Sequence, residues 1–269
     1  MTRSDIPIGI LTRDRAVYLD VTLQSLEASD LPSGISLAIY DDVSTDPITR
    51  RFLDTTETIE IKHKWPTFKE WVAADLGLLD NKPLHGILGK MEVITSDLKA
   101  CTDPRIREDR HFGVVIASCQ AICKMFASYP KASAVILLQD DIVLTPNWYE
   151  QLVARLDIGT NQGIVAGMHL DYSGAEKGYY TAQCYMITRE FFKAEQVWFG
   201  IPHFNRKSFD VQICTRASRA GFKVELLRPY VCQHIGVDSV VRPARPFKED
   251  GWVRMGLKGA AKRADKLLK

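Results

Sequence analysis

The sequence predicts one α/β domain with a mixed, mostly parallel central sheet flanked by helices. The unbroken apolar run Ala134–Leu138 is typical of a strand that is covered on both faces, as in parallel sheets. Strand-like, helical and again strand-like segments follow one another in the first forty residues, which indicates a βαβ unit. A chain of 269 residues with 46% hydrophobic and 25% charged residues can also bury the core that such a domain needs.

The N-terminal segment supplies the first of these units. Ile6–Leu11 is a short apolar strand, Val17–Ser29 carries apolar residues at helical spacing, and Ile35–Tyr40 is a second strand. Polar residues follow each strand directly, Thr12–Arg15 after the first and Asp41–Pro47 after the second. Ligands of open α/β sheets bind beyond the carboxyl ends of the strands, so we expect both polar segments to face a binding site.

The C-terminal half continues the alternation. A helix that starts near Gly113 leads into the apolar strand at 134, and Thr145 and Pro146 predict the cap and first turn of the next helix. A helical stripe from Phe209 to Ala220 is closed by Gly221, a frequent C-cap residue. Shorter apolar segments predict further strands: Ile164–Met168, Gln183–Thr188, Val224–Leu227 and Tyr230–Cys232.

We therefore expect a domain over residues 1–239 and a separate tail. Residues 55–112 show no sustained period and predict an irregular insertion, with Phe68–Leu79 as its best candidate helix. Residues 240–269 hold nine Lys/Arg and three Asp/Glu, a net +6 in a chain of net +2. This basic, partly helical tail could contact nucleic acid, anionic lipid or phosphate, or could simply be a solvated helix.

The cysteines and the apolar segments bear on the cellular compartment. The six cysteines form no CxxC pair, so reduced, mostly buried thiols are favoured over a zinc site. No apolar span of 18 residues is present, and Met1–Ile10 lacks the apolar core of a signal peptide. These features predict a cytoplasmic protein without an integral membrane segment; the oligomeric state is left open.

Two adjacent carboxylates, Asp140 and Asp141, follow the most apolar strand. Hard oxygen donors at this position suit Mg²⁺ or Mn²⁺ holding a diphosphate. Asp141, nearer the strand's exit, is the expected ligand, while Asp140 would touch a ribose or reach the ion through water. His234 could complete the oxygen shell. The alternatives are that the carboxylates cap the helix at Thr145–Pro146 and that His234 is structural.

The ends of the two N-terminal strands form a plausible nucleoside pocket. Asp41 or Asp42 could accept a hydrogen bond from a base N–H, and Arg15 could pair with a phosphate. The segment Asp41–Asp46 can equally be a turn held by Asx and Ser/Thr hydrogen bonds.

Four segments together resemble the GT-A (Rossmann-like) glycosyltransferases, in particular family 2 and the N-acetylglucosaminyltransferase I group. Ile8–Arg15 resembles the nucleotide loop of the first strand, and Asp41–Asp46 resembles the DDxSTD segment that contacts the base. Gln139–Trp148 resembles the DxD metal motif with its following helix start. Gln233–Gly236, with Ser239, is similar to the late HxG segment. The four occur in the family's order.

The resemblance covers residues 6–55 and 113–239 and departs from the family in two ways. Gln139 stands where the first DxD position has an acid, which is compatible with metal binding by the last carboxylate alone. The insertion at 55–112 and the tail match nothing in the family, so they reveal no acceptor.

The resemblance implies a nucleotide-sugar donor, most often a UDP-sugar, with Mn²⁺ or Mg²⁺ and a hydroxyl acceptor for the transferred hexosyl or pentosyl group. An inverting enzyme needs a general base. Asp210 stands where such enzymes carry an acid at a helix start, although it could equally be a favourable charge in the first turn of that helix; Asp171 is the second candidate. Tyr179 and Tyr180 could stack on a sugar or base, or belong to the core. The implied donor-binding residues are Thr12, Arg13, Arg15, Asp41, Asp42 and Asp140, and the implied metal ligands are Asp141 and His234.

Three alternatives remain open at this point. A nucleotidyltransferase that makes sugar nucleotides would be expected to have a Gly-rich first loop, which Thr12–Arg15 is not. A non-catalytic scaffold would bind the sugar nucleotide without turnover. The acceptor is expected to be a glycan or glycan precursor, in a bacterial cell or a phage-infected host. Hydroxymethylated pyrimidines in phage DNA are the other acceptor class, with Arg242, Arg245 and Lys248 of the tail on the phosphates.

Overall fold

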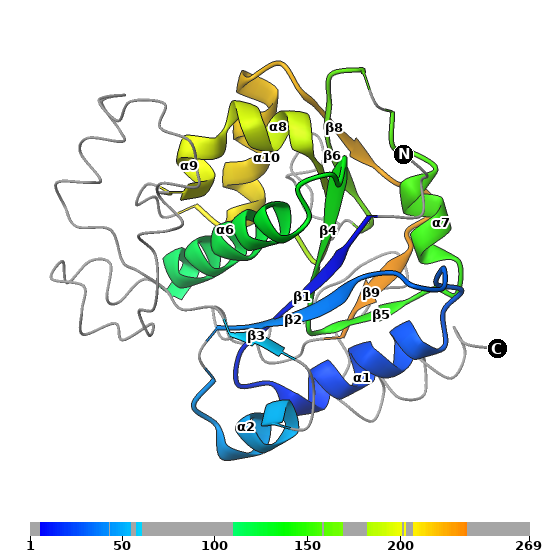
Figure 1. The fold of residues 1–269 in the computed structure, drawn as a ribbon, viewed down its shortest axis with the longest axis vertical. Helices are drawn as coiled ribbons and strands as arrows, with labels where there is room; N and C mark the ends of the chain where they lie inside the picture. Colours follow the sequence, from blue (N-terminus) through cyan, green and yellow to red (C-terminus); the bar gives the residue numbers. More distant parts are fainter. Residues whose placement is uncertain are drawn as a thin grey trace, which may run out of the picture.

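The fold is built on a mixed central sheet, as expected. The computed structural model describes residues 6–42, 44–54, 58–60, 110–157, 159–168, 182–200, 202 and 207–235. In these residues the large sheet has seven strands in the order β3-β2-β1-β4-β7-β6-β8 (Figure 1). The strands are β1 (Ile8–Thr12), β2 (Leu37–Asp41), β3 (Thr58–Glu60), β4 (Ala134–Gln139), β6 (Gln162–Ala166), β7 (Cys184–Thr188) and β8 (Lys223–Leu226).

Most neighbouring strands of this sheet run parallel. The pairs β1·β2, β1·β4, β2·β3 and β6·β8 are parallel, and β7 runs antiparallel to both β4 and β6. The carboxyl ends of β1, β2 and β4 therefore meet at one edge. The register places Thr12 beside Asp41 and Leu11 beside Gln139, so the polar residues that follow these strands start side by side.

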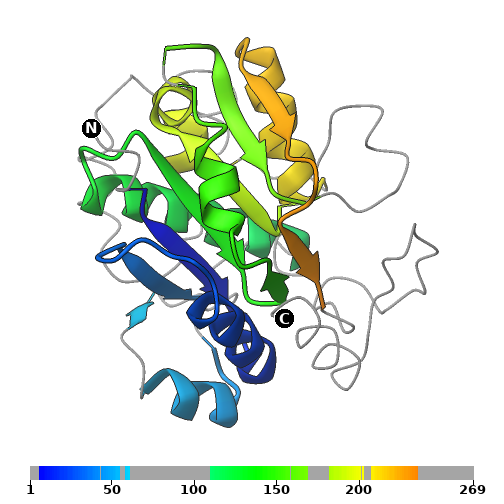
Figure 2. The same ribbon diagram turned by 90° about the vertical axis from the view of Figure 1, so that its right-hand side faces the viewer.

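Helices cover both faces of the sheet. Figure 2 shows helices in front of the strands and α6 (Arg110–Ser128) behind them. The front helices are α1 (Ala16–Glu27) and α7 (Trp148–Val153), and α2 (Pro47–Asp54) lies near α1. The opposite face carries α6 (Arg110–Ser128), α8 (Arg189–Ala194), α9 (Gln196–Gly200) and α10 (Phe209–Arg219).

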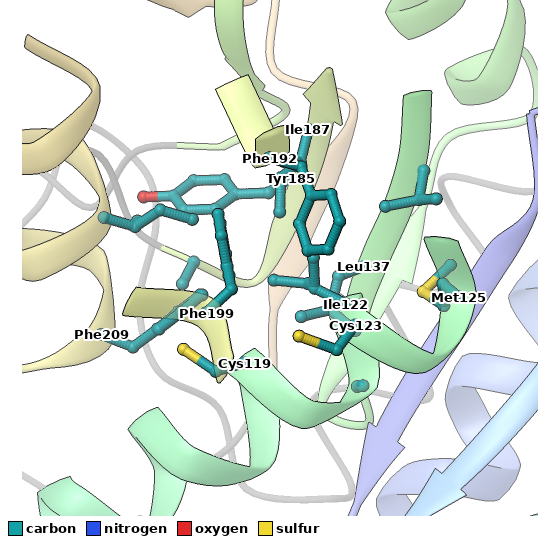
Figure 3. Close-up of a cluster of buried hydrophobic side chains, with 14 of the residues drawn as sticks. Cys119, Ile122, Cys123, Met125, Leu137, Tyr185, Ile187, Phe192, Phe199 and Phe209 are labelled. Carbon is teal, nitrogen blue, oxygen red and sulfur yellow. The ribbon is translucent and has the colours of Figure 1, made fainter. Parts of the chain in front are cut away.

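The alternation of side chains along each strand divides the core between these two faces. In β7, Tyr185 and Ile187 pack with α6, α9 and α10, whereas Cys184 and Met186 pack with α1 and α7. Figure 3 shows the first of these clusters, which is rich in aromatic and sulfur-bearing side chains. Five cysteines are buried free thiols, in agreement with their predicted burial: Cys119, Cys123, Cys184, Cys214 and Cys232.

A small second sheet explains why a strand, and not a helix start, follows Asp140 and Asp141, and why the next helix begins later than predicted. After Asp141 the chain forms β5 (Ile142–Leu144), which pairs antiparallel with β9 (Cys232–His234). The expected helix after Pro146 begins only at Trp148, because the Thr145 hydroxyl donates to the Val231 carbonyl at 3.2 Å and so extends this pairing instead of capping a helix.

A glycine ends one helix and a proline begins another. Gly221 follows α10 with a φ of 80°, so its predicted role in ending that helix is confirmed. Pro47, the last residue of the polar segment after β2, begins α2, where its fixed φ suits the first helical position. The candidate helix Phe68–Leu79 lies outside the described residues.

Candidate active site

Asp140 lies at the carboxyl end of β4, where hydrogen bonds from β1 and α1 hold it. The Thr12 hydroxyl donates to Asp140 Oδ2 at 2.7 Å, and the Thr22 hydroxyl donates to the Asp140 carbonyl at 2.9 Å. Only 3% of Asp140 is exposed. Burial raises the pKa of Asp140 to about 7, with the neighbouring Asp141 adding to the shift and Arg15 opposing it. Asp140 is thus a buried acid whose charge depends on its neighbours.

Asp141 is the better stabilised of the two carboxylates. His234 Nε2 lies 2.7 Å from Asp141 Oδ2, and Arg15 Nη2 approaches the same oxygen at 2.7 Å. Burial opposes ionisation, but His234 and Arg15 outweigh it and hold the pKa of Asp141 below its usual value. The β5·β9 pairing creates this contact, because it places His234 opposite Ile142, and the Ile235 amide donates to the Asp141 carbonyl at 2.8 Å.

Arg15 bridges both carboxylates from the start of α1. Its Nη1 is 3.3 Å from Asp140 Oδ1, and its guanidinium also lies 4.6 Å from the Tyr18 ring. Burial by itself would lower the pKa of Arg15, but the two carboxylates outweigh burial and raise this pKa above its usual value. The carboxylates therefore contact Thr12, Arg15 and His234, so the alternative in which they cap the following helix is wrong.

A second pair of acids lies at the carboxyl end of β2. Asp41 accepts the Ser44 hydroxyl at 2.6 Å and both its oxygens accept the Ser44 amide, while Arg50 is 3.5 Å away. Arg13 Nη1 is 3.3 Å from Asp42 Oδ2. Burial raises the pKa of Asp41, partly offset by the Ser44 hydrogen bonds. The segment Asp41–Asp46 is thus a hydrogen-bonded turn, and its two acids line the edge of the sheet at which β1, β2 and β4 end.

The donor atoms around Asp141 fit a divalent cation that also takes ligands from a substrate. Asp141 Oδ1 is buried and has no hydrogen-bond partner among the described residues, and the imidazole of His234 lies beside it. Within the described part of the chain, this site included, no group of three or more His, Cys, Asp or Glu side chains is placed so that it could hold a metal ion by itself. Mg²⁺ and Mn²⁺ sites of phosphate-transfer enzymes commonly combine one or two carboxylates with substrate oxygens, which matches this incomplete set.

The other predicted site residues are placed only in part. Asp210 lies in the first turn of α10, at the helix start where it was expected. Asp171, Tyr179 and Tyr180 lie outside the described residues, and so does the basic tail with Arg242, Arg245 and Lys248. The acceptor side of the site therefore remains a prediction.

Some residues of the site were not singled out from the sequence. The Thr22 hydroxyl, inside α1, bonds to the carbonyls of Asp140 and Ile142 and fixes the strand that carries the acids. Asp14 holds the loop after β2. Thr22 has no sequence signal, because a threonine inside a helix is ordinary. Asp14 could have been found from its place between Arg13 and Arg15.

The sequence matches no protein-family model and no curated protein. Solved structures with a similar fold include the mannosyltransferase PcManGT from Pyrobaculum calidifontis in complex with GDP-Man and Mn²⁺, at 12% identity, TM-score 0.48, and coverage of 88% of this chain and 58% of that one. The galactosyltransferase LgtC with donor and acceptor sugar analogues is similar at 13% identity, TM-score 0.45, with 98% and 97% covered. S. aureus TarS 1–349 with UDP-GlcNAc is similar at 10% identity, TM-score 0.46, with 85% and 57% covered.

These values describe a distant likeness of shape, so the function has to be inferred from the chain's own residues. The chain spans just over half the length of PcManGT and of the TarS fragment. Among the described helices, none is both long and apolar enough to cross a bilayer.

Proposed function

We propose that this protein is a metal-dependent glycosyltransferase that moves a sugar from a nucleoside-diphosphate sugar to a hydroxyl group, with inversion at the anomeric carbon. The acceptor we propose is a glycan or glycan precursor, and the donor a UDP-sugar. One observation carries the proposal: the ends of β1, β2 and β4, together with β9, bring two acid pairs, two arginines and a histidine to one edge of the sheet.

The two acid pairs suit the two ends of a nucleoside diphosphate. The β2 end carries Asp41 and Asp42, acceptors for base or ribose hydroxyl and N–H groups. At the β4 end, Asp141 and the adjacent His234 of β9 would hold Mn²⁺ or Mg²⁺; when bound, such an ion neutralises the charge that develops on the departing diphosphate. Arg13 contacts Asp42 and would supply positive charge to the diphosphate, which would lie between the two acid pairs.

Arg15 performs a related task in the same site. Its guanidinium keeps the buried acids of β4 compensated, since an unpaired buried carboxylate would carry a large desolvation penalty. It lies at the start of α1, where the helix dipole also favours anions. A diphosphate arriving at this edge therefore meets an arginine that is already positioned and charged.

Proton transfer is assigned to Asp210. An attacking hydroxyl must lose its proton as it bonds to the anomeric carbon, and a carboxylate within reach can accept it. Asp210 lies in the first turn of α10, which packs on the sheet face opposite α1. In this proposal the β4 acids serve the donor's diphosphate and Asp210 serves the acceptor's hydroxyl. Asp171 is the second candidate for this role.

A thermal-shift panel of nucleotide sugars, measured with and without Mn²⁺, tests the proposal. A ligand that binds the folded state raises the melting temperature, so one UDP-sugar should do so only in the presence of the metal. The protein with Asp141→Asn should show no metal-dependent shift, and hydrolysis of the same donor should be lost with it. A panel without any shift would refute the proposal. Binding without transfer or hydrolysis would favour the scaffold alternative.

A further inference from the structure

Asp14 has a backbone conformation that non-glycine residues seldom adopt. Its φ is 52°, in the left-handed region, where Asp and Asn are the best tolerated residues after glycine. It stands between Arg13 and Arg15, whose guanidinium groups contact Asp42 and the β4 acids respectively. The unusual turn at Asp14 thus allows two consecutive cationic side chains, one on either side, to reach two different acid pairs.

The side chain of Asp14 holds the loop that follows β2. Its Oδ1 accepts the amide of Thr45 at 2.5 Å and the amide of Asp46 at 2.7 Å, and its Oδ2 lies 3.3 Å from the Thr45 hydroxyl. Hydrogen bonds to a charged acceptor are stronger than neutral ones. One carboxylate therefore fixes two successive peptide groups of a loop about thirty residues away in the sequence.

The backbone of Asp14 extends the connection to the first acid pair. Its amide donates to the Ser44 hydroxyl at 2.8 Å, and this hydroxyl in turn donates to Asp41 Oδ1 at 2.6 Å. A parallel connection runs from the Ala16 amide to the Thr49 hydroxyl, at 3.1 Å. The loops after β1 and β2 are thus joined at several points, with Asp14 as the residue that contributes both backbone and side chain.

We propose that Asp14 is a positioning residue, which holds the base-binding loop after β2 at a fixed spacing from the diphosphate-binding arginines of the loop after β1. The inference rests on the proposed function and adds a residue to it. Asp14 does not contact the donor in this scheme; it acts through Ser44 and Asp41 on one side and through its neighbours Arg13 and Arg15 on the other. A donor that must satisfy both loops at once then binds without the cost of ordering them.

Three substitutions separate the carboxylate from the backbone conformation. Asp14→Gly removes the acceptor but suits a positive φ, and Asp14→Ala removes the acceptor and adds backbone strain. Asp14→Asn keeps an oxygen for the two amides and tolerates the left-handed region. Asp20→Asn is the matched control for loss of one negative charge, because Asp20 accepts a hydrogen bond from Gln24 of its own helix α1 and from no other side chain within the part of the chain that the structure describes.

The measurements are the affinity for the UDP-sugar found in the panel, its KM and kcat, and the melting temperature. We expect Asp14→Gly to raise Kd and KM about tenfold while kcat changes less than about threefold, because two charge-assisted hydrogen bonds are lost away from the reacting atoms. Asp14→Asn should recover most of this affinity, and Asp20→Asn should behave as wild type.

The possible results are distinct. Wild-type affinity in Asp14→Gly, or a loss confined to melting temperature or kcat, overturns the positioning role while the proposed function stands. A wild-type protein that binds no nucleotide sugar overturns both. If Asp14→Gly does not fold, Ser44→Ala tests the same connection from the β2 side: an unchanged KM in that variant also overturns the role, and a raised KM supports it.

Discussion

The two acid pairs of this protein share a dipeptide and a position at the end of a strand, but their surroundings differ. Asp41 and Asp42 are bonded mainly to nearby residues, and their arginine partners are partly exposed, with Arg13 at 35% and Arg50 at 47% side-chain exposure. Asp140 and Asp141 are bonded to groups 93 to 128 residues away, and their arginine partner is 15% exposed. All four carboxylates are buried, so the two pairs differ in the exposure of their arginine partners and in how far along the chain their partners lie.

This difference indicates which pair is suited to bind a metal ion and a diphosphate, and which is suited to recognise a neutral base or ribose. The arginine partners of the β2 acids are partly exposed and therefore screened by solvent and salt, so the β2 acids can exchange partners with a base or ribose at a lower cost. The β4 acids are paired with the more deeply buried Arg15 and His234, where electrostatic interactions are stronger, so replacing or adding a cation there has large consequences. We therefore assign recognition to the β2 pair and charge neutralisation to the β4 pair.

Asp141→Asn should reduce metal-dependent activity more than any other substitution. A small effect would contradict the assignment of charge neutralisation to the β4 pair. Loss of the carboxylate should abolish the Mn²⁺-dependent binding and hydrolysis of the donor, with turnover reduced about 10³-fold or more. It should also lower the melting temperature, because Arg15 and His234 lose a buried partner. Asp42→Asn is the comparison at the other pair: donor affinity should fall while Mn²⁺ dependence persists. Equal metal dependence in wild type and Asp141→Asn would remove Asp141 from the site.

Asp210→Asn tests an acid that belongs to neither pair. If Asp210 removes the acceptor's proton, transfer should fall about 10²-fold or more while donor and metal affinity stay at wild-type values. Rates of donor hydrolysis and of transfer, measured side by side, separate the two effects. An unchanged kcat for transfer would give the base role to Asp171, whose Asn variant is the next to measure.

His234→Ala should sharpen the distinction between ligand and structural residue. A ligand lost from an incomplete protein shell should weaken Mn²⁺ affinity about tenfold or more, measured by metal titration of the folded protein. Ser25→Ala is a suitable control, because the hydrogen bonds that its hydroxyl forms among the described residues go to the backbone of Leu144 and Thr22. Superimposable titrations of wild type and His234→Ala would make His234 a structural partner of Asp141.

The smallest expected effect is on the pH dependence of the melting temperature of the metal-free protein. The folded pKa of Asp140, about 7, lies above the ordinary 3.8 of an unfolded chain, so the folded state retains a proton that the unfolded state has lost between these values. Asp140 therefore destabilises the fold increasingly as the pH rises through that interval. Asp140→Asn should flatten this dependence and raise the melting temperature at about pH 8 by about 2 °C or more. Asp141 acts in the opposite sense and only at lower pH, so a series from about pH 5 to pH 8 isolates Asp140. A profile parallel to wild type would contradict the assignment.

Much of the architecture could be predicted from local pattern. The strand cores at 8–12, 37–41, 134–139 and 184–188 lie within or beside apolar runs, and α1, α6 and α10 follow helical spacing. The start of α7 was misplaced because the Thr145–Pro146 signal is local, whereas the Thr145 hydroxyl bonds to Val231, 86 residues away. The β5·β9 pairing was missed for the same reason, since three-residue strands have no period to detect.

Most residues of the candidate site were recognisable from the sequence because they lie at or just after the end of a strand, and the parallel strands β1, β2 and β4 bring their carboxyl ends to one edge. By itself the sequence determined the α/β class, the order of the main strands and helices, and the two acid pairs. Only the tertiary structure decided that His234 and Arg15 share Asp141, that Thr12 holds Asp140 and that Asp14 joins the two loops. The physical reason is that periodicity and capping report on neighbours a few residues apart, whereas the charge state of a buried acid is set by groups that folding brings from distant parts of the chain.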